Sequence, residues 1–122
     1  MKIEKISDIY EVLKGYTRKK RLVVAFANDS HSIEAVYMAV KAGLVEGILV
    51  GDTETIQGVC KENGYDESCF KIVHEPNDVR GAETAVEMIR NGEADVIMKG
   101  LVSTDKYMRA ILNKERGLVA PN

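Results

Sequence analysis

Four short apolar runs recur along the chain, and the segments between them have the spacing of amphipathic helices. The runs are RLVVAFA (21–27), GILVG (47–51), KIVHE (71–75) and DVIMKG (95–100). Strands that alternate with helices in this way are typical of repeated βαβ units. The runs are continuously apolar, which indicates strands that are covered on both faces. The sequence therefore predicts a three-layer α/β/α fold with a mainly parallel sheet and right-handed crossovers.

The segments between the runs carry the start and stop signals of helices. A polar residue that can cap a first turn precedes each segment, and a glycine follows three of them. In chain order, the expected signals are Ser30 or Ser32 with Gly43, Asp52 with Gly64, Asn77 or Asp78 with Gly92, and Ser103 or Thr104. The side chains expected to face the core are Ile33, Val36, Tyr37, Val40, Ile56, Val59, Cys60, Val79, Ala82, Val86, Ile89, Tyr107, Met108, Ile111 and Leu112. A further helix is expected at 7–15.

The size and charge of the chain limit its class. Its 122 residues, 45% of them hydrophobic and 30% charged, suit a single α/β domain over 1–122. Seventeen basic against nineteen acidic side chains give a net charge of −2, which offers no bulk attraction for nucleic acid or an anionic membrane. The basic cluster RKKR at 18–21 has no interleaved aromatic residue. We interpret it as a solvated junction before the first strand.

Sorting signals and cysteines favour a soluble, cytoplasmic protein. Acidic residues at Glu4, Asp8 and Glu11 interrupt the N-terminal segment, so it lacks the apolar core of a secretory signal. No run approaches the ~20 apolar residues that span a bilayer. The spacing of Cys60 and Cys69 matches neither a CxxC redox pair nor a zinc knuckle, and both are expected to be reduced thiols.

Ligands of open parallel sheets bind at the carboxyl ends of the strands. Four loops are expected at that edge, and they are ANDSHS (27–32), VGDTE (50–54), HEPND (74–78) and KGLVST (99–104). The first loop has no glycine, so the dinucleotide-binding fingerprint GxGxxG is absent, and no GxxxxGK[ST] P-loop occurs. These absences disfavour a Rossmann dehydrogenase and a P-loop NTPase.

The loop at 99–104 has the parts of a phosphate site. Gly100 lets backbone approach a ligand, and Lys99 adds a positive charge. Ser103 and Thr104 offer hydroxyls at a helix N-terminus, whose free N–H groups and dipole favour an anion. The alternative is structural: Ser103 caps the helix, Gly100 makes a turn, and Lys99 is a solvated residue at the rim.

The other loops give weaker signals. Asn28 and Asp29 can orient a ligand through an amide and a carboxylate, or they can cap the next helix. His31 and His74 lie at the same edge, but no HxH or HxxxH spacing places two ligands on one element, so no metal site is predicted. The nucleophile elbow GxSxG is absent and neither cysteine falls in these loops, which leaves covalent catalysis without support.

Two segments carry a resemblance to a known family. They are VVAFANDSHSIEAVYMAVKAGLVEGILVGDTETI and GAETAVEMIRNGEADVIMKGLVSTDKYMRAILNKERGL, in that order. They resemble the N-terminal part of the phosphate acetyl/butyryltransferases, in particular the phosphate butyryltransferase branch. The more specific part is NGEADVIMKGLVST followed by ILNKERGL. The resemblance implies the isocitrate/isopropylmalate dehydrogenase-like fold of phosphate acyltransferases, here truncated.

The resemblance also implies a reaction, the interconversion of acyl-CoA plus phosphate with acyl phosphate plus coenzyme A. Coenzyme A is then a substrate, and no metal or bound cofactor is required. Lys99, Gly100, Ser103 and Thr104 would line the phosphate side of the cleft. The family continues into a second α/β domain, so the catalytic residues are expected outside this chain and the fragment alone is expected to be inactive.

The sequence is also compatible with a second function, and it predicts association. The alternative function is a non-catalytic α/β domain that binds a small ligand or acts in regulation. A receiver domain is disfavoured, because Asp29 stands alone after the first strand and His74 ends the third. A sheet edge and an apolar surface left uncovered by a missing second domain predict association, so a homo-oligomer is expected.

Overall fold

The computed structural model describes residues 20–112. Their elements, in chain order, are β1 (Lys20–Ala25), α2 (Ser30–Lys41), β2 (Val45–Gly51), α3 (Thr53–Asn63), a 3₁₀ turn (Glu67–Cys69), β3 (Phe70–His74), α4 (Asp78–Arg90), β4 (Val96–Lys99) and α5 (Thr104–Leu112). The strict alternation of strands and helices confirms the expected βαβ units. The helix expected at 7–15 lies outside the described residues. No helix within 20–112 has the length and apolar character needed to cross a membrane.

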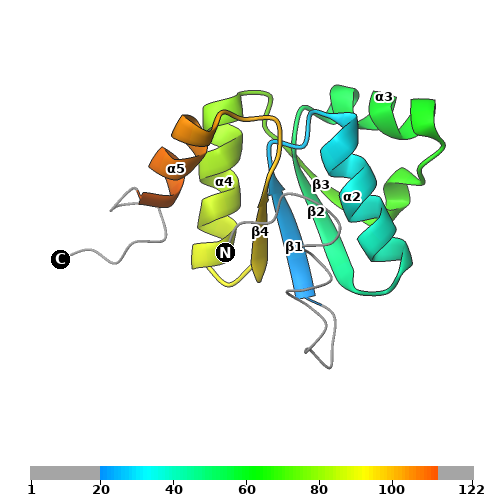
Figure 1. Ribbon diagram of the computed structural model, residues 1–122, viewed down its shortest axis with the longest axis horizontal. Coiled ribbons are helices and arrows are strands. Elements are labelled where there is room, and N and C mark those ends of the chain that lie inside the picture. Colours follow the sequence, from blue (N-terminus) through cyan, green and yellow to red (C-terminus); the bar gives the residue numbers. More distant parts are fainter. Residues whose placement is uncertain (1–19, 113–122) are drawn as a thin grey trace.

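All four strands are parallel, in the order β3-β2-β1-β4. Their arrows point to the same edge of the sheet in Figure 1. The chain moves outward from β1 to β2 and β3, and then returns to place β4 on the other side of β1. This reversal makes a topological switch point between the carboxyl ends of β1 and β4, which is the usual place for a ligand in a sheet of this kind.

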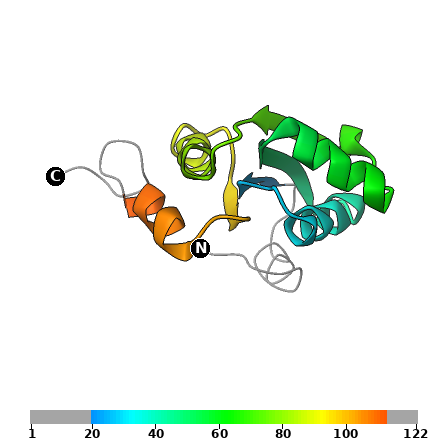
Figure 2. The same cartoon turned by 90° about the horizontal axis from the view of Figure 1, so that it is seen from above.

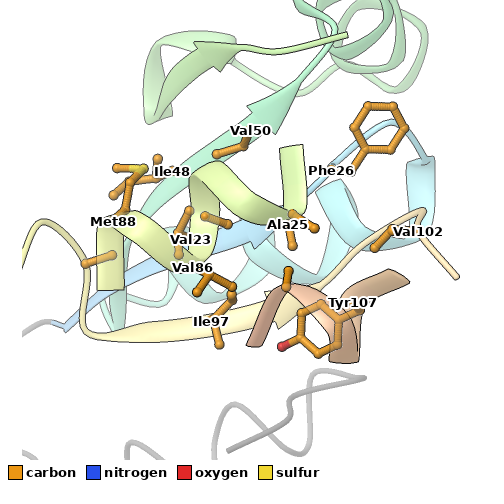
Figure 3. Packing of buried hydrophobic residues seen from close by; sticks show 14 residues of the cluster. Val23, Ala25, Phe26, Ile48, Val50, Val86, Met88, Ile97, Val102 and Tyr107 are labelled. Carbon is orange, nitrogen blue, oxygen red and sulfur yellow. The ribbon is translucent and has the colours of Figure 1, made fainter. Parts of the chain in front are cut away.

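Helices cover both faces of the sheet, which confirms the three-layer fold. Figure 2 shows α2 and α3 on one side and α4 with α5 on the other. Successive residues of β1 point to opposite faces. Leu22 and Val24 join the core beneath α2 and α3, whereas Val23 and Ala25 join the core beneath α4 and α5 (Figure 3). All four side chains are fully buried.

The first turn of α2 differs from the expectation. Its N-cap is Asp29, whose Oδ2 accepts the Ser32 N–H at 3.2 Å. The prediction of Ser30 or Ser32 as the cap is wrong, because the backbone is extended at Asp29, as an N-cap requires, and is already helical at Ser30. The alternative that Asp29 caps this helix is confirmed.

The other start and stop signals agree with the structure. Asp52 and Asn77 cap α3 and α4 through side-chain oxygens that accept backbone N–H groups at 3.1 and 3.0 Å. Ser103 Oγ accepts the Lys106 N–H at 3.2 Å and so caps α5. The backbone is left-handed at the glycines that follow α2, α3 and α4, with φ values of 77°, 72° and 76° at Gly43, Gly64 and Gly92.

Three side chains expected in the core are exposed, namely Val79, Met108 and Leu112. Val79 lies in the first turn of α4 and is 39% exposed. On α5, the buried positions are Tyr107 and Ala110. Met108 and Leu112 lie one turn apart on a different face of this outer helix. The apolar residues of α5 therefore extend beyond the face of the helix that packs against the core.

Tyr107 provides a test of this packing. Its side chain is 1% exposed, and its hydroxyl has no hydrogen-bond partner among the described residues. Burial raises its pKa to about 12. Because an unpaired buried hydroxyl is destabilising, Tyr107→Phe is expected to increase the free energy of unfolding by about 1 kcal/mol. Urea denaturation measures this change, with Tyr37→Phe on the opposite face as the control. A loss of stability in Tyr107→Phe would contradict the expectation.

Candidate functional site

The loops after β1 and β4 are joined at the switch point by two backbone hydrogen bonds. The Gly100 N–H donates to the Ala25 carbonyl at 3.0 Å, and the Leu101 N–H donates to the Phe26 carbonyl at 2.7 Å. The ladder between β1 and β4 thus continues past the end of β4. These bonds fix the backbone of 99–101 against β1, so the residues that follow start from a defined position.

Two glycines, Gly81 and Gly100, leave room for Phe26 where the loops after β1 and β4 meet. Phe26 has a φ of 66° and is the one described non-glycine residue with a left-handed backbone. A Cβ at Gly100 would overlap the Phe26 carbonyl group, and a Cβ at Gly81 would lie 3.0 Å from the Phe26 ring. A bulky residue with positive φ is strained and persists only where its surroundings hold it. The lack of a side chain at Gly100 therefore makes room for the backbone of Phe26.

A groove of about 330 Å³ opens beside the loop after β4. Its lining comes from the loop after β4 and from the first turns of α4 and α5. The lining residues are Asp78, Lys99, Gly100, Leu101, Val102, Ser103 and Lys106. The volume lies at the lower end of the range for small-ligand sites. The structure thus places predicted site residues Lys99, Gly100 and Ser103 in one groove and adds Asp78 and Lys106.

The charges of the groove are two ammonium groups and one carboxylate. Lys99 is half-buried at the end of β4, and its Nζ donates a long 3.4 Å bond to the Gly100 carbonyl. Lys106 Nζ lies 2.8 Å from Asp78 Oδ2. The hydrogen bond from Lys106 lowers the pKa of Asp78 and keeps it ionised. The N-terminus of α5 adds free N–H groups and the positive end of a helix dipole. The groove can therefore attract a small anion.

Ser103 has the structural role that the sequence left open, because its Oγ caps α5. Capping uses the hydroxyl as an acceptor, and a hydroxyl can donate a second bond at the same time. The cap and a contact with a ligand are therefore compatible. Thr104 follows as the first residue of α5 and is exposed. It does not line the groove.

Asn28 and Asp29 make structural contacts outside this groove. Asn28 Oδ1 accepts the Asp52 N–H at 2.9 Å and so ties the loop after β1 to the loop after β2. Asp29 caps α2 through Oδ2, while its Oδ1 is buried without a partner among the described residues. Their role as ligand contacts stays a prediction.

The histidines and cysteines lie apart from the groove. His31 is exposed on α2, and His74, the last residue of β3, accepts the Thr53 N–H at 3.2 Å through Nδ1. Cys60 is buried, which raises its pKa, and Cys69 is a second free thiol. Over residues 20–112, no three His, Cys, Asp or Glu side chains gather in an arrangement that could hold a metal ion.

A larger cavity of about 660 Å³ lies at the opposite, amino-terminal edge of the sheet. The starts of β2 and β3 line it, together with Gly92 and Glu93 after α4. Its lining includes both basic and acidic side chains, namely Arg21, Lys71 and Glu46. No described α-helix begins at this cavity, and the short 3₁₀ turn Glu67–Cys69 beside it carries no appreciable dipole, so the cavity lacks the features that favour an anion at a helix N-terminus. The groove at the switch point is the better candidate.

The fold and the groove define a doubly wound α/β protein with a cationic site at its switch point. Over 95% of its length the chain is 42% identical to a phosphate butyryltransferase of Clostridium acetobutylicum, and over 93% it is 34% identical to a phosphate acetyltransferase of Thermotoga maritima. The chain belongs to this family of phosphate acetyl- and butyryltransferases. It spans 38% and 37% of the length of these two relatives. No protein-family model matches the chain.

Solved structures confirm the fold. A phosphotransacetylase from Streptococcus pyogenes superposes with a TM-score of 0.71 at 18% identity, and the match covers 88% of this chain and 42% of that one. A branched-chain phosphotransacylase from Enterococcus faecalis gives a TM-score of 0.60 at 22% identity, covering 78% of this chain and 34% of that one. The comparisons favour the predicted family over the alternative of a non-catalytic binding domain.

Proposed function

We propose that the chain is part of a phosphate acyltransferase, which interconverts acyl-CoA plus phosphate with acyl phosphate plus coenzyme A. The observation that carries this proposal is the cationic groove at the switch point, where Lys99, Lys106 and the N-terminus of α5 converge. A phosphoryl group suits such a site, because the helix end supplies N–H donors and the lysines supply charge. The names of the relatives supply the acyl and coenzyme A parts of the reaction.

The groove has a clear task in this chemistry. The thiolate of coenzyme A attacks the carbonyl carbon of the acyl phosphate, a C–S bond forms, and the C–O bond to phosphate breaks. The leaving phosphate takes the electron pair, so negative charge grows on its oxygens. Lys99, the Ser103 hydroxyl and the first N–H groups of α5 bind this phosphate and stabilise the growing charge. Thr104, Asn28 and Asp29 lie outside the groove, at the same edge of the sheet, and are the further residues proposed to contact the substrate.

We also propose the wider context of the chain. Residues 1–122 form one α/β domain of a two-domain enzyme, and the second domain completes the cleft and activates the thiol. Support comes from the match to 38% of a relative's length. The net charge of −2 and the two free thiols favour a cytoplasmic protein that binds neither nucleic acid nor membrane. Exposed Leu101, Met108 and Leu112 favour a homo-oligomer.

The test uses the complete gene product that carries residues 1–122. It is expected to release phosphate from butyryl phosphate only when coenzyme A is present. Lys99→Met removes a charge-assisted contact with phosphate, so the KM for phosphate is expected to rise about tenfold while the KM for coenzyme A stays unchanged. Lys61→Met, in the last turn of α3, is the matched control. An absence of turnover with any short acyl phosphate would refute the proposed function.

A further inference from the structure

Leu101 is an exposed leucine at a position that two backbone hydrogen bonds fix. Its own N–H donates to the Phe26 carbonyl at 2.7 Å, and the Val102 N–H donates to the Gly100 carbonyl at 2.9 Å. The second bond closes a three-residue γ-turn with Leu101 at its centre. Val102 is 6% exposed and belongs to the core (Figure 3), whereas Leu101 is 55% exposed. The turn therefore holds Leu101 on the outside, at the groove that it lines.

The groove has a cationic part and an apolar part. Lys99, Ser103 and the N-terminus of α5 form the cationic part, to which we assign the phosphoryl group. Among the described residues that line the groove, Leu101 has the one exposed apolar side chain. Leu101 lies two residues from Lys99 and two from Ser103, so its Cα is at most about 7 Å from theirs. An apolar group attached to a bound phosphoryl group therefore begins within reach of Leu101.

The substrate of the proposed reaction has the same two parts. In an acyl phosphate, one oxygen joins the phosphorus to the carbonyl carbon, so the carbon chain begins close to the phosphoryl group. The groove volume of about 330 Å³ lies in the range of sites that hold a small organic molecule, which leaves room beside the phosphoryl group. Contact with an apolar side chain removes the carbon chain from water, and this contact favours longer chains.

We propose that Leu101 is a specificity-determining residue, whose side chain contacts the carbon chain of the acyl phosphate and favours butyryl over acetyl. This inference rests on the proposed function, because it takes the groove as the site of the phosphoryl group. A butyryl group has two more methylene groups than an acetyl group. An enclosed methylene changes kcat/KM by about 10–200-fold. Leu101 covers one side of an open groove, so its contribution over both methylene groups is expected to be about tenfold.

The test uses the complete gene product that carries residues 1–122 and measures kcat/KM with butyryl phosphate and with acetyl phosphate. Leu101→Ala is expected to lower the ratio of these values, butyryl over acetyl, about tenfold, while the KM for inorganic phosphate stays unchanged. Leu101→Met keeps an apolar side chain of similar volume and is expected to retain the ratio. Leu112→Ala is the matched control, because Leu112 is also 55% exposed but lies outside the groove.

The outcomes distinguish this inference from the proposed function. An unchanged ratio in Leu101→Ala, with both acyl phosphates still turned over, would overturn the inference and leave the proposed function intact. A change in oligomeric state together with an unchanged ratio would assign Leu101 to an interface between copies instead. An equal fall of the ratio in Leu112→Ala would show that the effect does not arise in the groove. An absence of turnover with both substrates in the unaltered enzyme would refute the proposed function itself.

Discussion

Gly100→Ala is expected to destabilise the protein by at least about 3 kcal/mol. The added Cβ would lie 2.8 Å from the Phe26 carbonyl carbon and 2.9 Å from the Ala25 carbonyl oxygen, and closer still to the Phe26 oxygen. These are backbone atoms of the central strand and its loop, so no side chain can move to make room. The loop after β4 would have to leave β1, breaking the two hydrogen bonds that Ala25 and Phe26 accept.

Gly58→Ala is the matched control for this substitution. Gly58 lies within α3, and a Cβ at that position meets no atom within 4 Å. Alanine there is expected to stabilise the protein by about 0.5–1 kcal/mol, because glycine loses more backbone entropy in a helix. Urea denaturation of both variants gives the comparison. If Gly100→Ala proved as stable as the unaltered chain, the close contact between the loops would be refuted.

The reason for Gly100 illustrates what the sequence could not reveal. From the sequence, a glycine after a strand predicts freedom to approach a ligand. The structure shows that the atoms approached belong to Phe26, which is distant along the chain and adjacent only because β4 returns to the side of β1. Local patterns encode the elements, because strand and helix periods are properties of short segments. The contacts between loops depend on strand order, which no short segment encodes.

The residues of the site also divide into those that a local pattern predicts and those that depend on how distant elements pack. Lys99 and Ser103 were predicted, because both belong to one loop whose position at a strand end follows from the βαβ pattern. Lys106 and Asp78 were missed as a pair, because the two residues lie on separate helices and meet only when α4 and α5 pack. One signal was present in the sequence, since Asp78 ends the loop at 74–78, at the edge where ligands bind. In the sequence alone, Asp78 indicates only a helix cap.

The other end of β4 is joined to β1 by a charged contact. Asp95 precedes β4, and its carboxylate accepts the Arg21 backbone N–H at 2.9 Å and the side-chain Nε at 3.1 Å. The Arg21 guanidinium also donates to the Gly92 carbonyl at 2.7 Å, and the Arg21 carbonyl accepts the Asp95 N–H at 2.8 Å. Backbone and side chain thus act together, which is more than a simple surface ion pair provides.

Asp95→Asn is therefore expected to lower the free energy of unfolding by about 1.5 kcal/mol at neutral pH, a figure that allows for the 34% exposure of the Asp95 side chain. Asp105→Asn, which breaks an exposed pair with Arg109 within α5, is the control and is expected to change stability by less than about 0.5 kcal/mol. Urea denaturation at neutral pH compares the two. Equal losses would show that Asp95 acts only as a surface charge.

The pH dependence of the Asp95 variant gives an independent test of the same contact. The hydrogen bonds from Arg21 lower the pKa of Asp95 from 3.8 to about 2. Because the folded-state pKa is depressed, the stabilisation is complete above the unfolded-state value and is lost as the pH falls from about 3.8 towards 2. Stability of the unaltered chain should therefore fall more steeply across this window than that of Asp95→Asn, and the difference between them should shrink. A constant difference down to about pH 2 would mean that asparagine weakens the packing of β4 rather than the charged contact. Gly100 holds the carboxyl end of β4, and Asp95 holds its amino end. Gly100→Ala and Asp95→Asn therefore separate the contributions of backbone fit and of charge to the position of β4, the strand that carries Lys99.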